Sequence, residues 1–142
     1  MQMTMNKVQS FISKTDLQRL RQTVAIVREV DPSKETLLAS LERKLTGVHV
    51  ISERKIEEDI VTMNSVVRLQ WLDTKESRIC WLGFPGTLNY DGHKVSILSP
   101  LGIALLGARV GEVAEQEVPA GFRQFKVLEI LYQPEAKKDY HL

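Results

Sequence analysis

Two carboxylates in the N-terminal half of the chain are the residues best suited to metal chemistry. Asp31 and Glu35 are four residues apart, and carboxylate oxygens of this kind hold divalent cations. Both residues also have an ordinary structural alternative. Aspartate is a good N-cap, and the helix dipole favours glutamate in the first turn. The pair is therefore predicted either to help position a metal ion or to start a helix.

The other reactive side chains indicate no catalytic group. His49, His93 and His141 are far apart in the sequence, and Cys80 is the single cysteine. This spacing indicates neither a zinc site nor a Cys–His nucleophile pair, and the sequence contains no glycine-rich phosphate-binding loop. We therefore expect a protein that is not an enzyme and that has no cofactor and no resident metal.

A basic stripe is the third chemical feature. Lys14, Arg21 and Arg28 are seven residues apart, which places them along one face of a helix. Such a face could contact RNA, or it could simply be solvated. The formal net charge of +1 gives no general electrostatic reason for binding nucleic acid or a membrane. The lone cysteine and the lack of a signal-peptide pattern lead us to expect a cytoplasmic location.

A helical hairpin is predicted to position these residues. Apolar side chains recur with 3-4-3 spacing in two stretches, as an antiparallel pair of helices requires. Thr15 with Gln18 predicts a capping box for the first helix, and Asp31 with Pro32 predicts the start of the second. Gly47 is expected to end it. Each helix would be roughly 22 Å long, with Asp31 and Glu35 at the tip. The two seams are Leu17, Leu20, Val24 and Val27, and Leu38, Leu41, Leu45 and Val48.

The rest of the chain is predicted to be rich in strands. A charged connector at about residues 48–59 precedes alternating apolar stretches near 65–73, 78–84, 95–98, 113–118 and 122–132. A chain of 142 residues has room for one ordinary domain, or for a small domain with an appendage. We therefore assign residues 1–52 to the hairpin and residues 53–142 to an α+β domain.

A short apolar helix interrupts the strands. Ser99 is a good N-cap, Pro100 suits the first helical position, and Gly107 can adopt the left-handed conformation that ends a helix. A helix this short and apolar must be surrounded by other elements. Leu101 is predicted to be either an exposed anchor or part of the core.

These residues carry a resemblance to a known family. The pattern S-P-x-G-x-A-L-L-G, followed by V-G-E, within Ser99–Glu112 resembles the C-terminal domain of the GreA/GreB transcription factors. Two flanking motifs are similar to the Rnk-type branch of that family. They are D-I-V-T-M-N-S at Asp59–Ser65 and Y-Q-P-E-A at Tyr132–Ala136, the latter completed by Asp139, Tyr140 and Leu142.

The resemblance implies an FKBP-like domain, in which an antiparallel sheet curls around one short helix. It also implies a partner, RNA polymerase, bound at the rim of the secondary channel through a surface that would include Ser99, Pro100 and Leu101. In Gre factors a helical finger carries acidic residues towards the catalytic magnesium and promotes cleavage of backtracked RNA. In this chain Asp31 and Glu35 would occupy the finger tip. Lys14, Arg21 and Arg28 would be the possible RNA contacts inside the complex.

Two departures from the Gre pattern favour an occupant of the channel over a cleavage factor. Leu98 stands where Gre proteins usually carry an acidic residue, and a finger of roughly 22 Å is short for reaching the active centre. We expect a monomer that competes with Gre factors. The alternative is a peptidyl-prolyl isomerase or a peptide-binding chaperone, as an FKBP-like fold would suggest. The resemblance to Rnk-type proteins also implies an influence on the level of nucleoside diphosphate kinase. We expect this influence to be indirect, through transcription.

Overall fold

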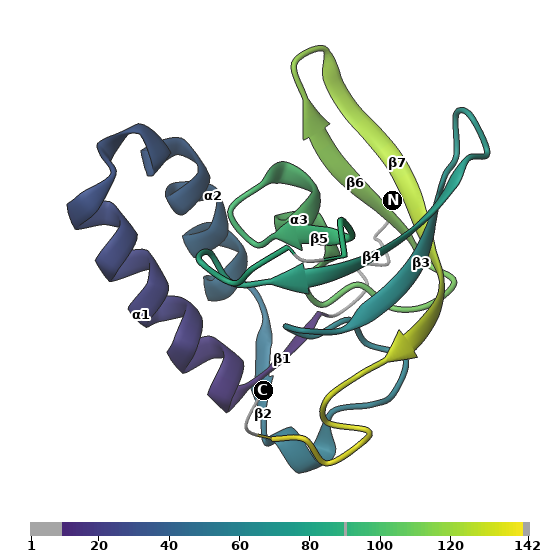
Figure 1. Cartoon of the computed structure of the whole chain (residues 1–142), viewed down its shortest axis with the longest axis horizontal. Coiled ribbons are helices and arrows are strands. Elements are labelled where there is room, and N and C mark those ends of the chain that lie inside the picture. Colours follow the sequence, from purple (N-terminus) through teal and green to yellow (C-terminus); the bar gives the residue numbers. More distant parts are fainter. Residues whose placement is uncertain (1–9, 90, 141–142) are drawn as a thin grey trace, which may run out of the picture.

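The computed structural model describes residues 10–89 and 91–140. Figure 1 shows a helical hairpin lying beside a curled sheet, with one short helix between them. His141 and Leu142, which belong to the predictions above, lie outside the described residues. No helix in the described part of the chain is long and apolar enough to cross a membrane.

The hairpin consists of α1 (Lys14–Val30) and α2 (Glu35–Thr46), joined by the short 3-10 helix η1 (Pro32–Lys34). The predicted seams are confirmed. Six of the eight seam residues are buried, and Val27 and Val48 are partly buried against the same core. Both seams face inwards because residues three and four apart share one side of a helix. We call residues 13–20 and 43–47 the base of the hairpin and residues 26–36 its tip.

The predicted helix ends are right in part. The capping box of Thr15 and Gln18 is wrong, because α1 begins two residues earlier and its cap is Ser13, whose Oγ accepts the Asp16 backbone N–H at 3.0 Å. Thr15 instead bonds the carboxylate of Glu53 through its backbone N–H and its hydroxyl. Asp31 caps the η1 turn and not α2 itself. Gly47 ends α2, as predicted.

The two ends of the hairpin are joined by a small sheet that the sequence did not reveal. Strands β1 (Phe11–Ser13) and β2 (His49–Ile51) run parallel, with Ile12 opposite Val50. Each has three residues, which is too short for an alternating pattern to be recognised. A second 3-10 turn, η2 (Glu53–Lys55), follows β2. The small sheet closes the base of the hairpin.

The main sheet has five strands in the order β5-β4-β3-β7-β6. Strands β3, β4, β6 and β7 pair in antiparallel fashion, but β4 and β5 are parallel, with Leu82 opposite Val95. The prediction of an antiparallel, FKBP-like sheet is therefore wrong. The physical reason is that β5 runs in the same direction as β4, and a parallel neighbour needs a longer return connection than the tight turn that joins antiparallel strands. The strands are β3 (Val66–Trp71), β4 (Ser77–Gly83), β5 (Lys94–Ser96), β6 (Val113–Val118) and β7 (Gly121–Tyr132).

The short helix α3 (Pro100–Leu105) lies in the hollow of this sheet and faces α2 on its other side (Figure 1). Ile103 and Leu105 are buried, and so are Phe125 and Val127 of β7, in one continuous core. Gly107 has a φ of +80° directly after the helix, as predicted for a left-handed end. The position of α3 thus depends on both the sheet and the hairpin.

Candidate functional site

The N-terminal end of α3 presents one exposed residue on a rigid support. The Ser99 Oγ accepts the Gly102 backbone N–H at 3.0 Å and donates to the Ser96 carbonyl at 2.7 Å. The hydroxyl of Ser99 is thus engaged as both donor and acceptor within the chain. Pro100, the next residue, is exposed. Of the three residues predicted for a docking surface, Pro100 is therefore the most exposed.

Leu101 lies in the core. Its side chain is 7% exposed and packs within the main apolar cluster. Leu98, just before the cap, is also buried. The two leucines flank Ser99 and Pro100 in the sequence. Their packing in the core fixes the start of α3, while Pro100 is exposed on the surface.

Gly102 is a structural requirement that our reading of the motif did not explain. A Cβ on this residue would lie 2.0 Å from the Ser96 carbonyl oxygen. No side chain fits at that distance, so the backbone of α3 can approach the end of β5 only with glycine here. The signal was present in the sequence, because Gly102 is the first glycine of the S-P-x-G pattern.

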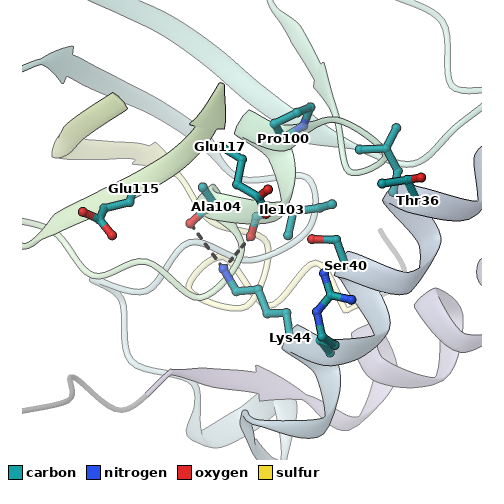
Figure 2. Close-up of a pocket in the computed structure, with 10 residues that line it drawn as sticks. Thr36, Ser40, Lys44, Pro100, Ile103, Ala104, Glu115 and Glu117 are labelled. Carbon is teal, nitrogen blue, oxygen red and sulfur yellow. Dashed lines mark hydrogen bonds between the residues drawn. The ribbon is translucent and has the colours of Figure 1, made fainter. Parts of the chain in front are cut away.

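A cleft lies beside Pro100, between α2, α3 and β6 (Figure 2). Its volume is about 350 Å³, and its floor includes Pro100, Ile103 and Ala104. Arg43 and Lys44 of α2 also line it, together with Glu115 and Glu117 of β6. The cleft therefore combines an apolar floor with a basic side and an acidic side.

Lys44 holds the C-terminal end of α3. Its Nζ donates to the carbonyl oxygens of Ile103 at 2.5 Å and Ala104 at 3.3 Å, as the dashed lines in Figure 2 show. A cation at this end of a helix satisfies carbonyls that lack a partner and interacts favourably with the dipole. Burial lowers the pKa of Lys44 to about 8. Sequence reasoning missed Lys44, although it lies three residues after the seam residue Leu41, on the same side of the helix.

The two carboxylates predicted at the hairpin tip have separate partners. The Oδ1 of Asp31 accepts the Ser33 hydroxyl at 2.5 Å, and this bond lowers the pKa of Asp31. Glu35 forms an ion pair with Arg28 at 2.9 Å. In the described residues, no three His, Cys, Asp or Glu side chains are grouped so as to hold a metal ion. Asp31 and Glu35 thus each have a local partner at the tip of the hairpin, and a role for them with a metal ion stays a prediction.

The basic stripe on α1 is divided in the structure. Lys14 and Arg21 are exposed, whereas Arg28 binds two carboxylates, Glu35 at 2.9 Å and Glu42 at 2.6 Å. The bond to Arg28 lowers the pKa of Glu42. The charge of Arg28 is therefore neutralised locally, while Lys14 and Arg21 remain on the surface of α1.

Asp16 is the second residue that sequence reasoning missed. It is 3% exposed at the base of α1, and its Oδ2 accepts the Met63 backbone N–H at 3.1 Å. Burial raises the pKa of Asp16 to about 7, and the carboxylate of Glu135 acts in the same direction. Glu135 in turn accepts the Thr62 hydroxyl at 2.8 Å. The motifs at Asp59–Ser65 and Tyr132–Ala136 thus meet the hairpin at this point.

Known proteins resemble this chain in sequence. Residues 56–132 match the sequence model of the family described as "Transcription elongation factor, GreA/GreB, C-term". The chain is 38% identical over 112 residues to "Regulator of nucleoside diphosphate kinase" of Escherichia coli strain K12, covering 78% of this chain and 79% of that protein. It is 33% identical over 103 residues to "Transcription elongation factor GreA" of Chloroherpeton thalassium, covering 72% of this chain and 65% of that protein.

The fold of this chain is also similar to that of a solved structure from the same family. The structure titled "Prokaryotic transcription elongation factor GreA/GreB from Nitrosomonas europaea" is similar with a TM-score of 0.68 and 30% identity, covering 87% of this chain and all of that one. This likeness corrects the FKBP-like prediction and removes the basis of the peptidyl-prolyl isomerase alternative. The resemblance expected from the motifs is confirmed. Since the family match spans more than half of the chain, the chain belongs to the GreA/GreB transcription elongation factor family.

Proposed function

We propose that this protein is a transcription regulator that binds RNA polymerase at the rim of the secondary channel and competes there with Gre factors. The observation that carries the proposal is Pro100, an exposed residue at the start of a helix whose two ends are both held in place. The names of its relatives, a regulator and a transcription elongation factor, support the same class of function.

The proposed action is occupation of the channel without stimulation of transcript cleavage. Helix α1 has 17 residues, which corresponds to about 26 Å and makes a short finger. At the tip, Asp31 caps a turn and Glu35 is paired with Arg28. Both carboxylates thus have local partners at the tip, and we propose that they do not position a metal ion for cleavage.

Contact with nucleic acid would be minor in this proposal. Lys14 and Arg21 are exposed on α1 and could face RNA inside the complex. Arg28 would first have to leave Glu35 and Glu42. We propose a monomer acting on polymerase, in which the α3 surface supplies affinity and the hairpin supplies steric occupation.

Competition for core RNA polymerase tests this function. Labelled GreA bound to polymerase should be displaced by the wild-type protein at micromolar concentration. Pro100→Asp places a charge on the docking surface, and we expect it to weaken displacement about tenfold, which corresponds to about 1.4 kcal/mol. Pro119→Asp, at an exposed proline in the β6–β7 turn, is the matched control and should displace GreA as the wild type does.

Two results would contradict the proposal. If the wild-type protein does not bind at micromolar concentration, polymerase is not its partner. If Pro100→Asp displaces GreA as well as the wild type does, the docking surface lies elsewhere. A cleavage assay on backtracked complexes completes the test, and we expect no stimulation by this protein.

A further inference from the structure

Lys44 joins two parts of the molecule. It lies in the last turn of α2, and its amine bonds two carbonyls at the end of α3. Among the described residues, these are the hydrogen bonds that connect α2 with α3. The N-terminal end of α3 carries Pro100, so a change at Lys44 acts on the support of the exposed surface.

The side chain of Lys44 borders two cavities. Lys44 lines the cleft of about 350 Å³ and also a second cavity of about 210 Å³ on the side of Gly107 and Ala108. It has no ion-pair partner in the described part of the chain. An acetyl group adds three heavy atoms, so the cleft has room for it.

The chemical state of the amine favours nucleophilic attack. Burial lowers the pKa of Lys44 to about 8. Near neutral pH a much larger share of this amine is therefore neutral than in a lysine of ordinary pKa. Only the neutral amine has the lone pair that attacks an acyl carbon.

The charges around the cleft indicate which acyl donor fits. Arg43 lines the same cleft as Lys44 and has no ion-pair partner among the described residues. A guanidinium suits a phosphate group, which it can bind in a bidentate manner. Glu115 and Glu117 line the β6 side of the cleft, and their negative charges would repel an anion there. The phosphate would therefore lie on the α2 side, next to Arg43.

We propose that Lys44 is an acylation site for small acyl phosphates and that its acylation disconnects α2 from α3. The neutral amine attacks the acyl carbon, a C–N bond forms, and the C–O bond to phosphate breaks. The electron pair of that bond leaves with inorganic phosphate, and the amine loses a proton to water. The product is an uncharged amide with one N–H, so it can bond at most one of the two carbonyls and no longer complements the end of α3.

Site-resolved labelling tests the modification itself. The full chain is treated with acetyl phosphate at about pH 7.5, and the acetylation rate of each lysine is measured by peptide mass spectrometry. We expect Lys44 to react about tenfold faster than the exposed Lys55 and Lys137. A rate for Lys44 no greater than theirs would overturn the proposal. This test uses the unmodified sequence and does not depend on the fold of any variant.

A variant of Arg43 tests the donor class. Arg43→Ala should slow the reaction of Lys44 with acetyl phosphate and leave its reaction with phenyl acetate, an uncharged acyl donor, unchanged. Equal effects on the two reagents would overturn the assignment of an anionic donor. Arg43 is exposed, so the substitution should not affect folding.

Hydrogen exchange tests the structural consequence. Protein acetylated at Lys44 should show amide exchange about tenfold faster in α3 and in the last turn of α2, because loss of the link permits local opening. Lys44→Gln, which is also uncharged, should exchange faster than Lys44→Arg, which keeps the charge. Unchanged exchange after acetylation would overturn the disconnection. We also expect acetylation of Lys44 to weaken binding to polymerase; this expectation rests on the proposed function, whereas the labelling and exchange results do not.

Discussion

The base and the tip of the helical hairpin are built from similar residue types but in opposite environments. At the base, Asp16 is buried and bonded to the Met63 backbone, and Lys44 is bonded to α3. At the tip, Arg28 and Glu35 form an ion pair on the surface, and Ile26 is 64% exposed. Charged residues at the base thus have the rest of the protein as their surroundings, whereas those at the tip have mainly water.

This difference predicts where the hairpin is sensitive to change. A buried polar group has no water to replace a lost partner, so its bonds and its charge state affect stability strongly. Exposed ion pairs compete with water and salt and contribute little. The base should therefore control how firmly the hairpin is attached, while the tip should tolerate substitution. Three substitutions test this comparison, from the largest expected effect to the smallest.

The largest effect is expected at Leu20. This side chain is fully buried at the base of α1, so Leu20→Ala should lower the free energy of unfolding by about 2–5 kcal/mol through lost burial and a residual cavity. Ile26→Ala, six residues further along the same helix and mostly exposed, is the matched control and should cost no more than about 0.5 kcal/mol. Urea unfolding measures both. Equal losses would contradict the distinction between base and tip.

An intermediate, pH-dependent effect is expected at Asp16. Its pKa is raised from 3.8 to about 7, so between these values the folded protein binds more protons than the unfolded chain does. The free energy of unfolding contributed by Asp16 is therefore fully present below pH 3.8 and falls as the pH rises towards 7, by on the order of 2–4 kcal/mol. Asp16→Asn keeps an acceptor for Met63 and should remove this dependence.

The measurement is the free energy of unfolding at several pH values from about 4 to 8, compared between the wild type and Asp16→Asn. The pKa of Glu135 is raised as well, and the Glu135 carboxylate interacts with Asp16, so the difference between the two proteins reports the ionisation of Asp16 together with this interaction. Asp31→Asn is the control at the tip. The pKa of Asp31 is lowered, so its stabilisation is present at neutral pH and is lost as the pH falls. If the free energy of unfolding changes with pH in the same way for the wild type and for Asp16→Asn, the ionisation of Asp16 does not affect how firmly the base of the hairpin is attached.

The smallest effect is expected at Arg28. Arg28→Ala removes both ion pairs at the tip, with Glu35 and Glu42, but all three side chains are accessible to water. We expect a slight decrease in Tm at low salt and no difference from the wild type at about 1 M salt, where charges on the surface are screened. A large decrease that persists at high salt would mean that the tip is as tightly integrated as the base.

Local patterns were sufficient for several predictions. The spacing of Leu17, Leu20 and Val24 placed one face of α1 in the core, because helical periodicity depends only on the chain itself. The cap at Ser99 and the left-handed Gly107 also followed from single residues and their neighbours. The motifs around α3 predicted the family, and the comparisons confirm it.

Predictions that required long-range information failed or were not possible. The direction of β5 relative to β4 depends on the path of the loop at 84–93, and the pairing of β1 with β2 depends on the closure of the hairpin. For the candidate site, the three predicted residues separate into the cap Ser99, the exposed Pro100 and the buried Leu101. The local pattern S-P-L is compatible with each of these roles.

The sequence by itself thus determined which faces of the helices are apolar, where α3 begins and to which family the chain belongs. These properties depend on residues close together in the chain. The tertiary structure alone decided that Asp16 is a buried carboxylate and that Lys44 caps a helix 59 residues away. An aspartate or a lysine has the same covalent structure everywhere, and its charge, pKa and reactivity are set by the groups that folding places around it.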